Sequence, residues 1–151
     1  MSDLIDVTDN PLAGKFVIES DGRWFHDGEE ITHVRTWQYF SRTIKCDPDG
    51  TVYLTDGKVR INIEVKDAPL LVTAIRIEPA GVRLRLHDET YVTLDPATIR
   101  FLGGAPYCTA REGLAAKFTT TAWMQLSDLI EESPDGFVLV LNGKKYPVSQ
   151  K

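Results

Sequence analysis

The sequence predicts a mostly β protein of the α+β class, in which a ββ-α-ββ unit is duplicated in tandem. We expect the second half to be larger, with about seven strands and one helix. Three observations lead to this prediction: a repeated phrase, an apolar helix face in each copy, and a hairpin signal after each helix. The phrase runs from Trp37 to Gly50 and again from Trp123 to Gly136, 86 positions later, and residues 37–62 share nine identities with residues 123–148.

Each copy contains apolar side chains at helical spacing, which predicts one buried helix face per copy. The faces consist of Val34, Trp37, Phe40 and Ile44 in the first copy, and Trp123, Leu126 and Ile130 in the second. We expect Thr32 to cap the first helix, and Thr120 or Thr121 to cap the second. The Pro-Asp-Gly phrases are predicted to end the helices, because proline disfavours helix in the residue before it.

A β-hairpin is predicted after each helix. In the first copy a strand over 51–55 is followed by an Asp56-Gly57 turn and by strict apolar–polar alternation over 59–65. In the second copy Asn142-Gly143 is a strong signal for a two-residue turn. Upstream of each helix we expect a strand–turn–strand segment, with equivalent turns ending at Gly22 and Gly113.

Three further strands are predicted between the copies, over Leu70–Glu78, Val82–His87 and Tyr91–Leu94. Proline interrupts strand pairing, so the Asp67-Ala68-Pro69 segment is the predicted domain boundary. Residues 1–67 then form an N-terminal β-rich domain with one helix. Residues 68–151 form a C-terminal β-rich domain with one helix.

Composition is typical of a globular protein without a membrane segment. The net charge of −5 argues against general binding to the nucleic-acid backbone. No apolar run approaches the length of a membrane helix, and the acidic N-terminus does not resemble a signal peptide. Cys46 and Cys108 lack metal-ligand spacing, and we expect both to remain free thiols in the cytoplasm.

Two motifs resemble those of a bacterial family of unknown function. They are Asp21–Gly28 ("DGRWFHDG") and Arg111–Ala116 ("REGLAA"). The resemblance extends over residues 16–148 and implies two tandem β-rich domains, the second loosely similar to the pleckstrin-homology fold. It also implies a signalling role and a nucleotide-like ligand between the domains.

No catalytic, metal or cofactor site is predicted. His26 and His33 lack the tight spacing of zinc ligands, and the Asp47 segment lacks the ligands of an EF-hand loop. Cys46 and Cys108 have no histidine partner at a recognisable spacing, so packing is the favoured role for both. We therefore expect a protein that is not an enzyme.

A basic strand is the first candidate binding feature. Arg83, Arg85 and His87 alternate with apolar residues on one strand, and Arg76 lies on a neighbouring strand. Two interpretations remain open: a solvated sheet face, or a binding face for an anionic ligand or partner.

The second candidate is a ligand site built from Trp24, His26, Arg111 and Lys117, on the hairpins that the resemblance identifies. Trp24 would stack on a ligand, and the other three would contact an anion. Alternatively, Trp24 packs between domains and Arg111 pairs with a surface acid. The predicted function is a non-enzymatic ligand-binding or sensory module. The alternative is a protein–protein interaction scaffold that uses an exposed sheet face.

Overall fold

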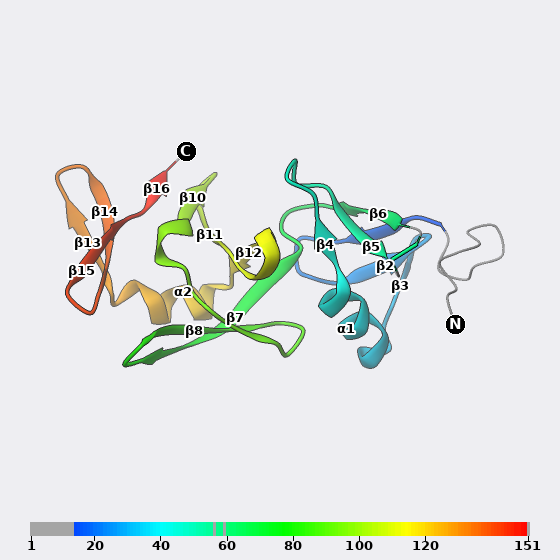
Figure 1. The fold of residues 1–151 in the computed structure, drawn as a ribbon, viewed down its shortest axis with the longest axis horizontal. Helices are drawn as coiled ribbons and strands as arrows, with labels where there is room; N and C mark the ends of the chain where they lie inside the picture. Colours follow the sequence, from blue (N-terminus) through cyan, green and yellow to red (C-terminus); the bar gives the residue numbers. More distant parts are fainter. Residues whose placement is uncertain (1–13, 56, 59, 151) are drawn as a thin grey trace. The chain divides into compact units, whose positions relative to one another are not determined.

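The computed structural model describes residues 14–55, 57–58 and 60–150. It is mostly β with two α-helices, which confirms the predicted fold class (Figure 1). The chain divides into two compact units. Unit 1 contains Met1–Pro69 and Glu112–Leu114, and unit 2 contains Leu70–Arg111 and Ala115–Lys151. No helix in the described ranges is long and apolar enough to cross a membrane.

Unit 1 is a six-stranded sheet with one helix. Its strand order is β3-β2-β1-β6-β5-β4, in which only β1 and β6 are parallel. In chain order its elements are β1 (Phe16–Ile18), β2 (Trp24–His26), β3 (Glu29–Glu30), α1 (Val34–Thr43), β4 (Lys45–Cys46), β5 (Val52–Thr55) and β6 (Arg60–Val65). The predicted Asp56-Gly57 turn and the alternation that begins at Val59 each include one residue outside the described ranges.

Aromatic rings fill the core of unit 1. Phe16, Trp24 and Phe40 are buried and contact one another, with ring centroids 5.6–6.4 Å apart. Phe16 lies on β1, Trp24 on β2 and Phe40 on α1. These contacts therefore fix the helix against the sheet, since apolar burial is the main stabilising term in folding.

Unit 2 has a seven-stranded sheet, a separate three-stranded sheet and one α-helix. The strand orders are β16-β10-β11-β12-β7-β8-β9 and β13-β14-β15. The first half of the unit contains β7 (Leu70–Glu78), β8 (Gly81–Leu86), β9 (Tyr91–Thr93), η1 (Pro96–Thr98), β10 (Arg100–Leu102) and β11 (Ala105–Thr109). After the 3-10 turn η2 (Arg111–Gly113), it continues with β12 (Ala115–Phe118), α2 (Thr120–Ser127), β13 (Ile130–Ser133), β14 (Gly136–Leu141), β15 (Lys144–Pro147) and β16 (Ser149–Gln150).

The two units share one strand topology. In unit 1 the order is β3-β2-β1-β6-β5-β4; in unit 2 the corresponding strands are β12-β11-β10-β16 and β15-β14-β13. The pair types agree as well, because β1∥β6 and β10∥β16 are parallel and the other equivalent pairs are antiparallel. The single strand β6 corresponds to β15 and β16, which are separated at Val148. The repeat in the sequence is therefore a repeat in topology, and β7–β9 are added beside β12.

This topology corrects the predicted equivalence of Gly22 and Gly113. Gly22 lies between β1 and β2, whereas Gly113 lies between β11 and β12, which correspond to β2 and β3. The true counterpart of Glu112-Gly113 is Asp27-Gly28. Both turns have positive φ at two successive residues, 51° and 87° in the first and 51° and 80° in the second.

The predicted helix ends are also corrected. The N-cap of α1 is His33, without a side-chain capping bond, and that of α2 is Thr119, whose hydroxyl accepts a hydrogen bond from the Ala122 N–H. The Pro-Asp-Gly phrases do not end the helices. They form the turns that join β4 to β5 and β13 to β14, after helices that end at Thr43 and Ser127.

A β-bulge divides β7. The pairing of β7 with β8 shifts between Val72 and Ala74, so Thr73 is an extra residue in the ladder. Before the shift, buried Val72 pairs with buried Leu86; after it, Ile75 and Ile77 pair with buried Leu84 and Val82. The side chains of Ala74, Arg76 and Glu78 consequently face away from the core.

Candidate anion-binding site

The outer face of β7, β8 and β9 carries three arginines and an exposed tyrosine. Cross-strand pairing arranges the side chains in three rows: Ala74, Arg85 and Tyr91; then Arg76, Arg83 and Thr93; then Glu78 and Gly81. We call this surface the arginine face. The opposite face of β8 consists of buried Val82, Leu84 and Leu86, which anchor the strand in the core.

Arg76 and Arg83 lie directly opposite each other on neighbouring strands. Like charges in this position are unfavourable for the sheet. Arg83 has an acidic neighbour, because its Nε lies 3.7 Å from Glu78 Oε2. The Arg76 side chain makes no ion pair or hydrogen bond with another described residue. The pair therefore leaves positive charge that an anion could neutralise.

Arg85 is held in place at one end of the arginine face. Its Nη2 donates to both carboxylate oxygens of Glu89 at 2.7 Å, and these hydrogen bonds raise the pKa of Arg85 above its usual value. Tyr91, opposite Arg85 on β9, is 54% exposed. Its ring therefore offers an open surface beside the guanidinium groups.

A hollow of about 490 Å³ lies on the arginine face. Its lining consists of Ala74, Ile75, Arg76, Arg83, Arg85 and Tyr91. The small side chain of Ala74 leaves space that the longer side chains surround. Guanidinium groups suit phosphate and carboxylate oxygens because they offer several donors in one plane. This combination of shape and charge makes the hollow the candidate site in unit 2.

Sequence reasoning identified Arg83, Arg85 and Arg76 for this face but included His87 and missed Tyr91. His87 follows β8 and is half-buried, and its Nδ1 accepts a hydrogen bond from the Leu71 N–H at 3.2 Å. Burial lowers the pKa of His87 below its usual value. His87 therefore joins the end of β8 to the start of β7 and is not part of the arginine face. Tyr91 could have been found by alternation, since it lies two residues before Thr93 on an edge strand.

Trp24 and His26, two of the predicted ligand residues, lie on β2 in unit 1. Trp24 is only 1% exposed and packs against Phe16 and Phe40, so its ring presents no open stacking surface. The His26 ring stacks on Phe16, with centroids 4.6 Å apart, and its Nε2 lies 3.6 Å from Asp27 Oδ2. Both aromatic residues thus contribute to packing within unit 1.

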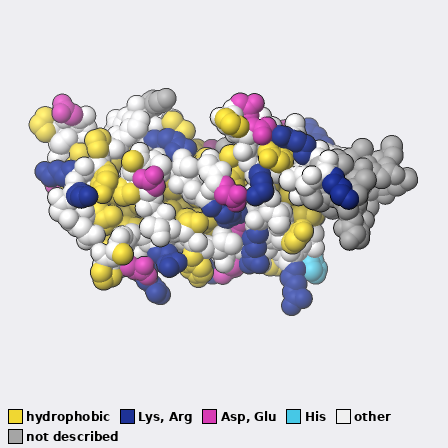
Figure 2. Space-filling model, viewed as in Figure 1, with side chains coloured by type: hydrophobic (Ala, Val, Ile, Leu, Met, Phe, Trp, Pro, Cys, Tyr) yellow, Lys and Arg dark blue, Asp and Glu magenta, His cyan; other side chains and the backbone are white. Residues whose placement is uncertain are grey.

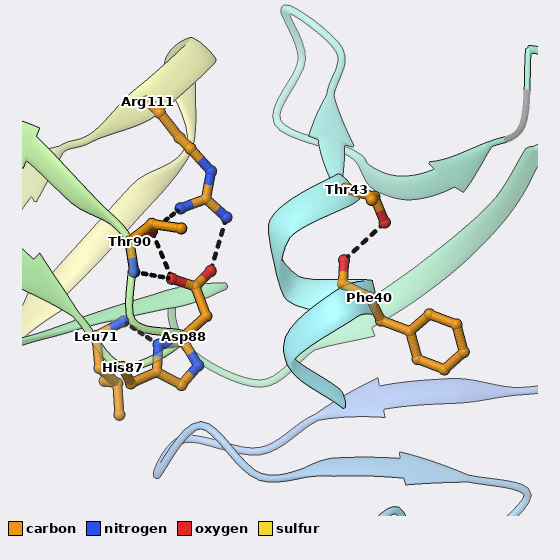
Figure 3. Close-up of polar contacts among 7 residues, drawn as sticks. All are labelled: Phe40, Thr43, Leu71, His87, Asp88, Thr90 and Arg111. Carbon is orange, nitrogen blue, oxygen red and sulfur yellow. Dashed lines mark hydrogen bonds and ion pairs between the residues drawn. The ribbon is translucent and has the colours of Figure 1, made fainter. Parts of the chain in front are cut away.

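Arg111, the third predicted ligand residue, belongs to a buried ion pair in unit 2 (Figure 3). Its guanidinium donates to Asp88 Oδ2 and to Thr90 Oγ1, both at 2.8 Å. Asp88 is fully buried and also accepts hydrogen bonds from the hydroxyl and the N–H of Thr90. The alternative that Arg111 pairs with an acid is therefore the arrangement found, although the acid is Asp88 in the interior and not a surface residue.

Lys117, the fourth, lies on β12 in unit 2, with its Nζ 5.9 Å from the centroid of the Tyr107 ring. Two of the four residues are thus in each unit. A single site made of all four, between the domains, remains a prediction.

The two cysteine side chains have defined surroundings: Cys108 is buried, and the Cys46 thiol donates to the Glu112 carbonyl oxygen at 3.5 Å. Cys46 and Cys108 are free thiols, as predicted. Burial raises the pKa of Cys108 to about 12, which keeps the thiol protonated. Within the described ranges, no group of three or more His, Cys, Asp or Glu residues is arranged to hold a metal ion.

The fold resembles that of solved structures from a bacterial protein family of unknown function. That family is DUF1285. Residues 11–68 match the model "Domain of unknown function (DUF1285), N-terminal domain". The resemblance predicted from the sequence, to a family of unknown function with β-rich tandem units, is thereby confirmed.

Two solved structures show the likeness over more of the chain. A DUF1285 family protein from Silicibacter pomeroyi DSS-3 is 26% identical, with a TM-score of 0.77, over 89% of this chain and 79% of that one. A DUF1285 family protein from Shewanella baltica OS155 shares the fold at 19% identity, with a TM-score of 0.68, over 76% of this chain and 91% of that one. No curated protein matches the sequence.

Proposed function

We propose that the chain is a non-enzymatic binding module that takes a small anionic ligand, nucleotide-like compounds included, on the arginine face. The observation that carries this proposal is the opposition of Arg76 and Arg83 beside a hollow of about 490 Å³. A bound anion removes the repulsion between the two guanidinium groups, and thereby adds to the free energy of unfolding of the complex.

The charge pattern on the side of the molecule drawn in Figure 2 supports a local site. On the side of the molecule in view, basic and acidic side chains are interspersed (Figure 2). A small ligand needs only a few converging donors, whereas binding to a nucleic-acid backbone needs a broad positive surface. The non-catalytic part of the proposal is supported by the protonated Cys108 thiol and by the engagement of Asp88 with Arg111. The two free thiols support a location in a reducing compartment such as the cytoplasm.

The proposal is tested by thermal-shift and calorimetric titration with pyrophosphate and ADP. Ligand at 100 times its Kd adds about 2.7 kcal/mol to the free energy of unfolding, which shifts the melting temperature measurably. We expect Arg76→Gln to abolish this shift while leaving the unliganded protein as stable as the wild type, or slightly more stable, because the opposed charges are removed.

Arg60→Gln is the matched control. Arg60 lies in unit 1, pairs with Asp47 at 2.8 Å and stacks on the Tyr53 ring, so its loss removes the same charge elsewhere. An equal loss of binding in both variants would indicate a general charge effect and reject the site. The absence of any ligand-induced shift in the wild type would reject the function.

A protein–protein scaffold is the second candidate. It is favoured by β9, an edge strand of the seven-stranded sheet whose Tyr91 is largely exposed. A partner bound by strand addition at this edge would use the main chain of Tyr91 and Thr93. Binding would then be insensitive to Arg76→Gln but lost in a Thr93→Pro variant, which removes an N–H that points away from β8, in pull-down measurements with the full chain.

A further inference from the structure

A second hollow in unit 2, of about 370 Å³, continues the arginine face along the strands. It is lined in part by Gly81 of β8, Thr93 of β9 and Tyr146 of β15. Gly81 lies two residues before Arg83, and Thr93 lies two residues after Tyr91, so the alternation of strands places them on the same face. Thr93 is also the cross-strand partner of Arg83. The linings of the two hollows therefore meet at the Arg83–Thr93 pair.

The distance between the hollows suits one elongated molecule. Arg85 and Gly81 are four residues apart on β8, which corresponds to about 13 Å along the strand. Gly81 has no side chain, and a Cβ built there would meet only the Thr93 methyl group, at 3.9 Å. The row of side chains is thus interrupted at the junction, and a ligand could pass from one hollow to the other over the strand.

The second hollow differs chemically from the first. Its walls combine apolar side chains with hydrogen-bonding groups and one lysine: Leu94, Pro96 and Leu141, then Thr93, Asn142 and Tyr146, and Lys144. Glu78 lies opposite Gly81 at the junction and adds negative charge there, beside Arg83. A second anionic group is therefore disfavoured at the junction, whereas an uncharged body with apolar and hydrogen-bonding groups is favoured.

The second hollow is held open by contacts inside unit 2. Asn142 of the β14–β15 turn donates from Nδ2 to the Pro79 carbonyl at 3.1 Å, which joins this turn to the β7–β8 turn. Asn142 has φ of 53° and is followed by Gly143 with φ of 80°, the left-handed geometry of a tight hairpin turn. This contact thus fixes one boundary of the second hollow within unit 2.

We infer that the two hollows together bind one amphipathic organic anion. Its anionic head lies among Arg76, Arg83 and Arg85, and its uncharged body extends past Gly81 into the second hollow. This inference rests on the proposed function, because the head uses the same arginines. It adds that the ligand is an organic phosphate or carboxylate with a body, and not an inorganic anion.

Calorimetry with a head-only probe and a head-plus-body probe tests the inference. Pyrophosphate supplies the head, and ADP supplies a similar head with an uncharged body. We expect the wild type to bind ADP about tenfold or more tightly than pyrophosphate. The Ala80→Trp variant fills the second hollow from an exposed position in the β7–β8 turn, outside the arginine face. It should lower ADP affinity to that of pyrophosphate and leave pyrophosphate affinity unchanged.

Lys144 and Lys145 provide a matched pair of controls. Lys144 lines the second hollow, whereas Lys145, its neighbour on β15, does not. Lys144→Gln should weaken ADP binding more than pyrophosphate binding, and Lys145→Gln should change neither. Equal wild-type affinity for the two probes, or equal weakening of both by Ala80→Trp, would overturn the second hollow and leave the proposed function standing. Failure of both probes to bind would overturn the two proposals together.

Discussion

Replacement of Arg111 by methionine should destabilise unit 2 without acting through a ligand. In the structure the guanidinium is mostly buried, with 15% side-chain exposure, and donates to the fully buried Asp88. Methionine keeps an apolar stem of similar length but removes the charge and both hydrogen bonds. The Asp88 carboxylate would then be buried without its cation.

The expected cost follows from these contacts. Removing one partner of a buried ion pair costs about 3–5 kcal/mol, because an uncompensated charge remains. The lost hydrogen bond to Thr90 adds about 1 kcal/mol, and partial solvent access at Arg111 acts in the opposite direction. We therefore expect Arg111→Met to lower the free energy of unfolding by about 3 kcal/mol. Combining it with Asp88→Asn should recover part of this loss, because no unpaired charge is left.

Urea denaturation followed by circular dichroism measures these differences. Hydrogen exchange of peptides from unit 2 accompanies it, because the two units need not unfold together. A single variant within about 1 kcal/mol of the wild type would refute the buried-pair argument, since that is the range of exposed ion pairs. If that variant also lost anion binding, Arg111 would be a ligand residue as the sequence predicted.

Three further predictions concern stability and reactivity. Trp24→Ala should lower the free energy of unfolding by about 3–5 kcal/mol, and by more than Trp37→Ala does, because Trp24 is fully buried and Trp37 is half-buried. If urea denaturation showed the larger loss for Trp37→Ala, the described core of unit 1 would be contradicted. The lowered pKa of His87 means that the folded state binds fewer protons than the unfolded state, so its stabilising contribution is present above about pH 6.5 and is lost as pH falls. Melting temperatures should accordingly decline less between pH 7.5 and pH 5.5 in His87→Gln than in the wild type, and equal slopes would exclude this role. Maleimide should modify Cys46 in the folded protein but Cys108 only in urea, because Cys108 is fully buried and its thiol remains protonated. Mass spectrometry measures the labelling, and equal labelling of both cysteines in native buffer would disprove the burial of Cys108.

Local signals in the sequence were sufficient for the presence of both helices, though not for their ends, and for the Asn142-Gly143 turn. Asn142-Gly143 specifies its own backbone geometry, and the apolar spacing from Val34 to Ile44 marks a helix without reference to distant residues. The Pro-Asp-Gly phrases were recognised as breaks but assigned to the wrong element. Their turn geometry is compatible with either a helix end or a hairpin, and only strand pairing separates the two.

Long-range pairing could not be predicted in the same way. The parallel pairs β1∥β6 and β12∥β7 join segments that are far apart in the sequence. No local pattern in either segment indicates which strand it will pair with. The role of Arg111 depends on Asp88, 23 residues earlier, which looks like an ordinary turn residue in the sequence. Two arginines of the candidate site were placed by alternation on β8, but the direction of Arg76 depended on an irregularity in β7.

That irregularity makes the chemistry of the arginine face depend on the pairing of one residue. The segments Leu70–Val72 and Ala74–Glu78 are two half-strands in opposite phase, and Thr73 is the residue that changes the phase. Deletion of Thr73 would leave Arg76 on the outer face, because Ala74 already pairs with Arg85, the residue next to Leu86. If the full sequence paired with β8 without the bulge, regular alternation from Val72 would instead turn Ala74, Arg76 and Glu78 toward the interior. Relatives that differ at Arg76 would lose one charge, whereas relatives that keep every residue of β7 but lack the bulge would lose the face itself.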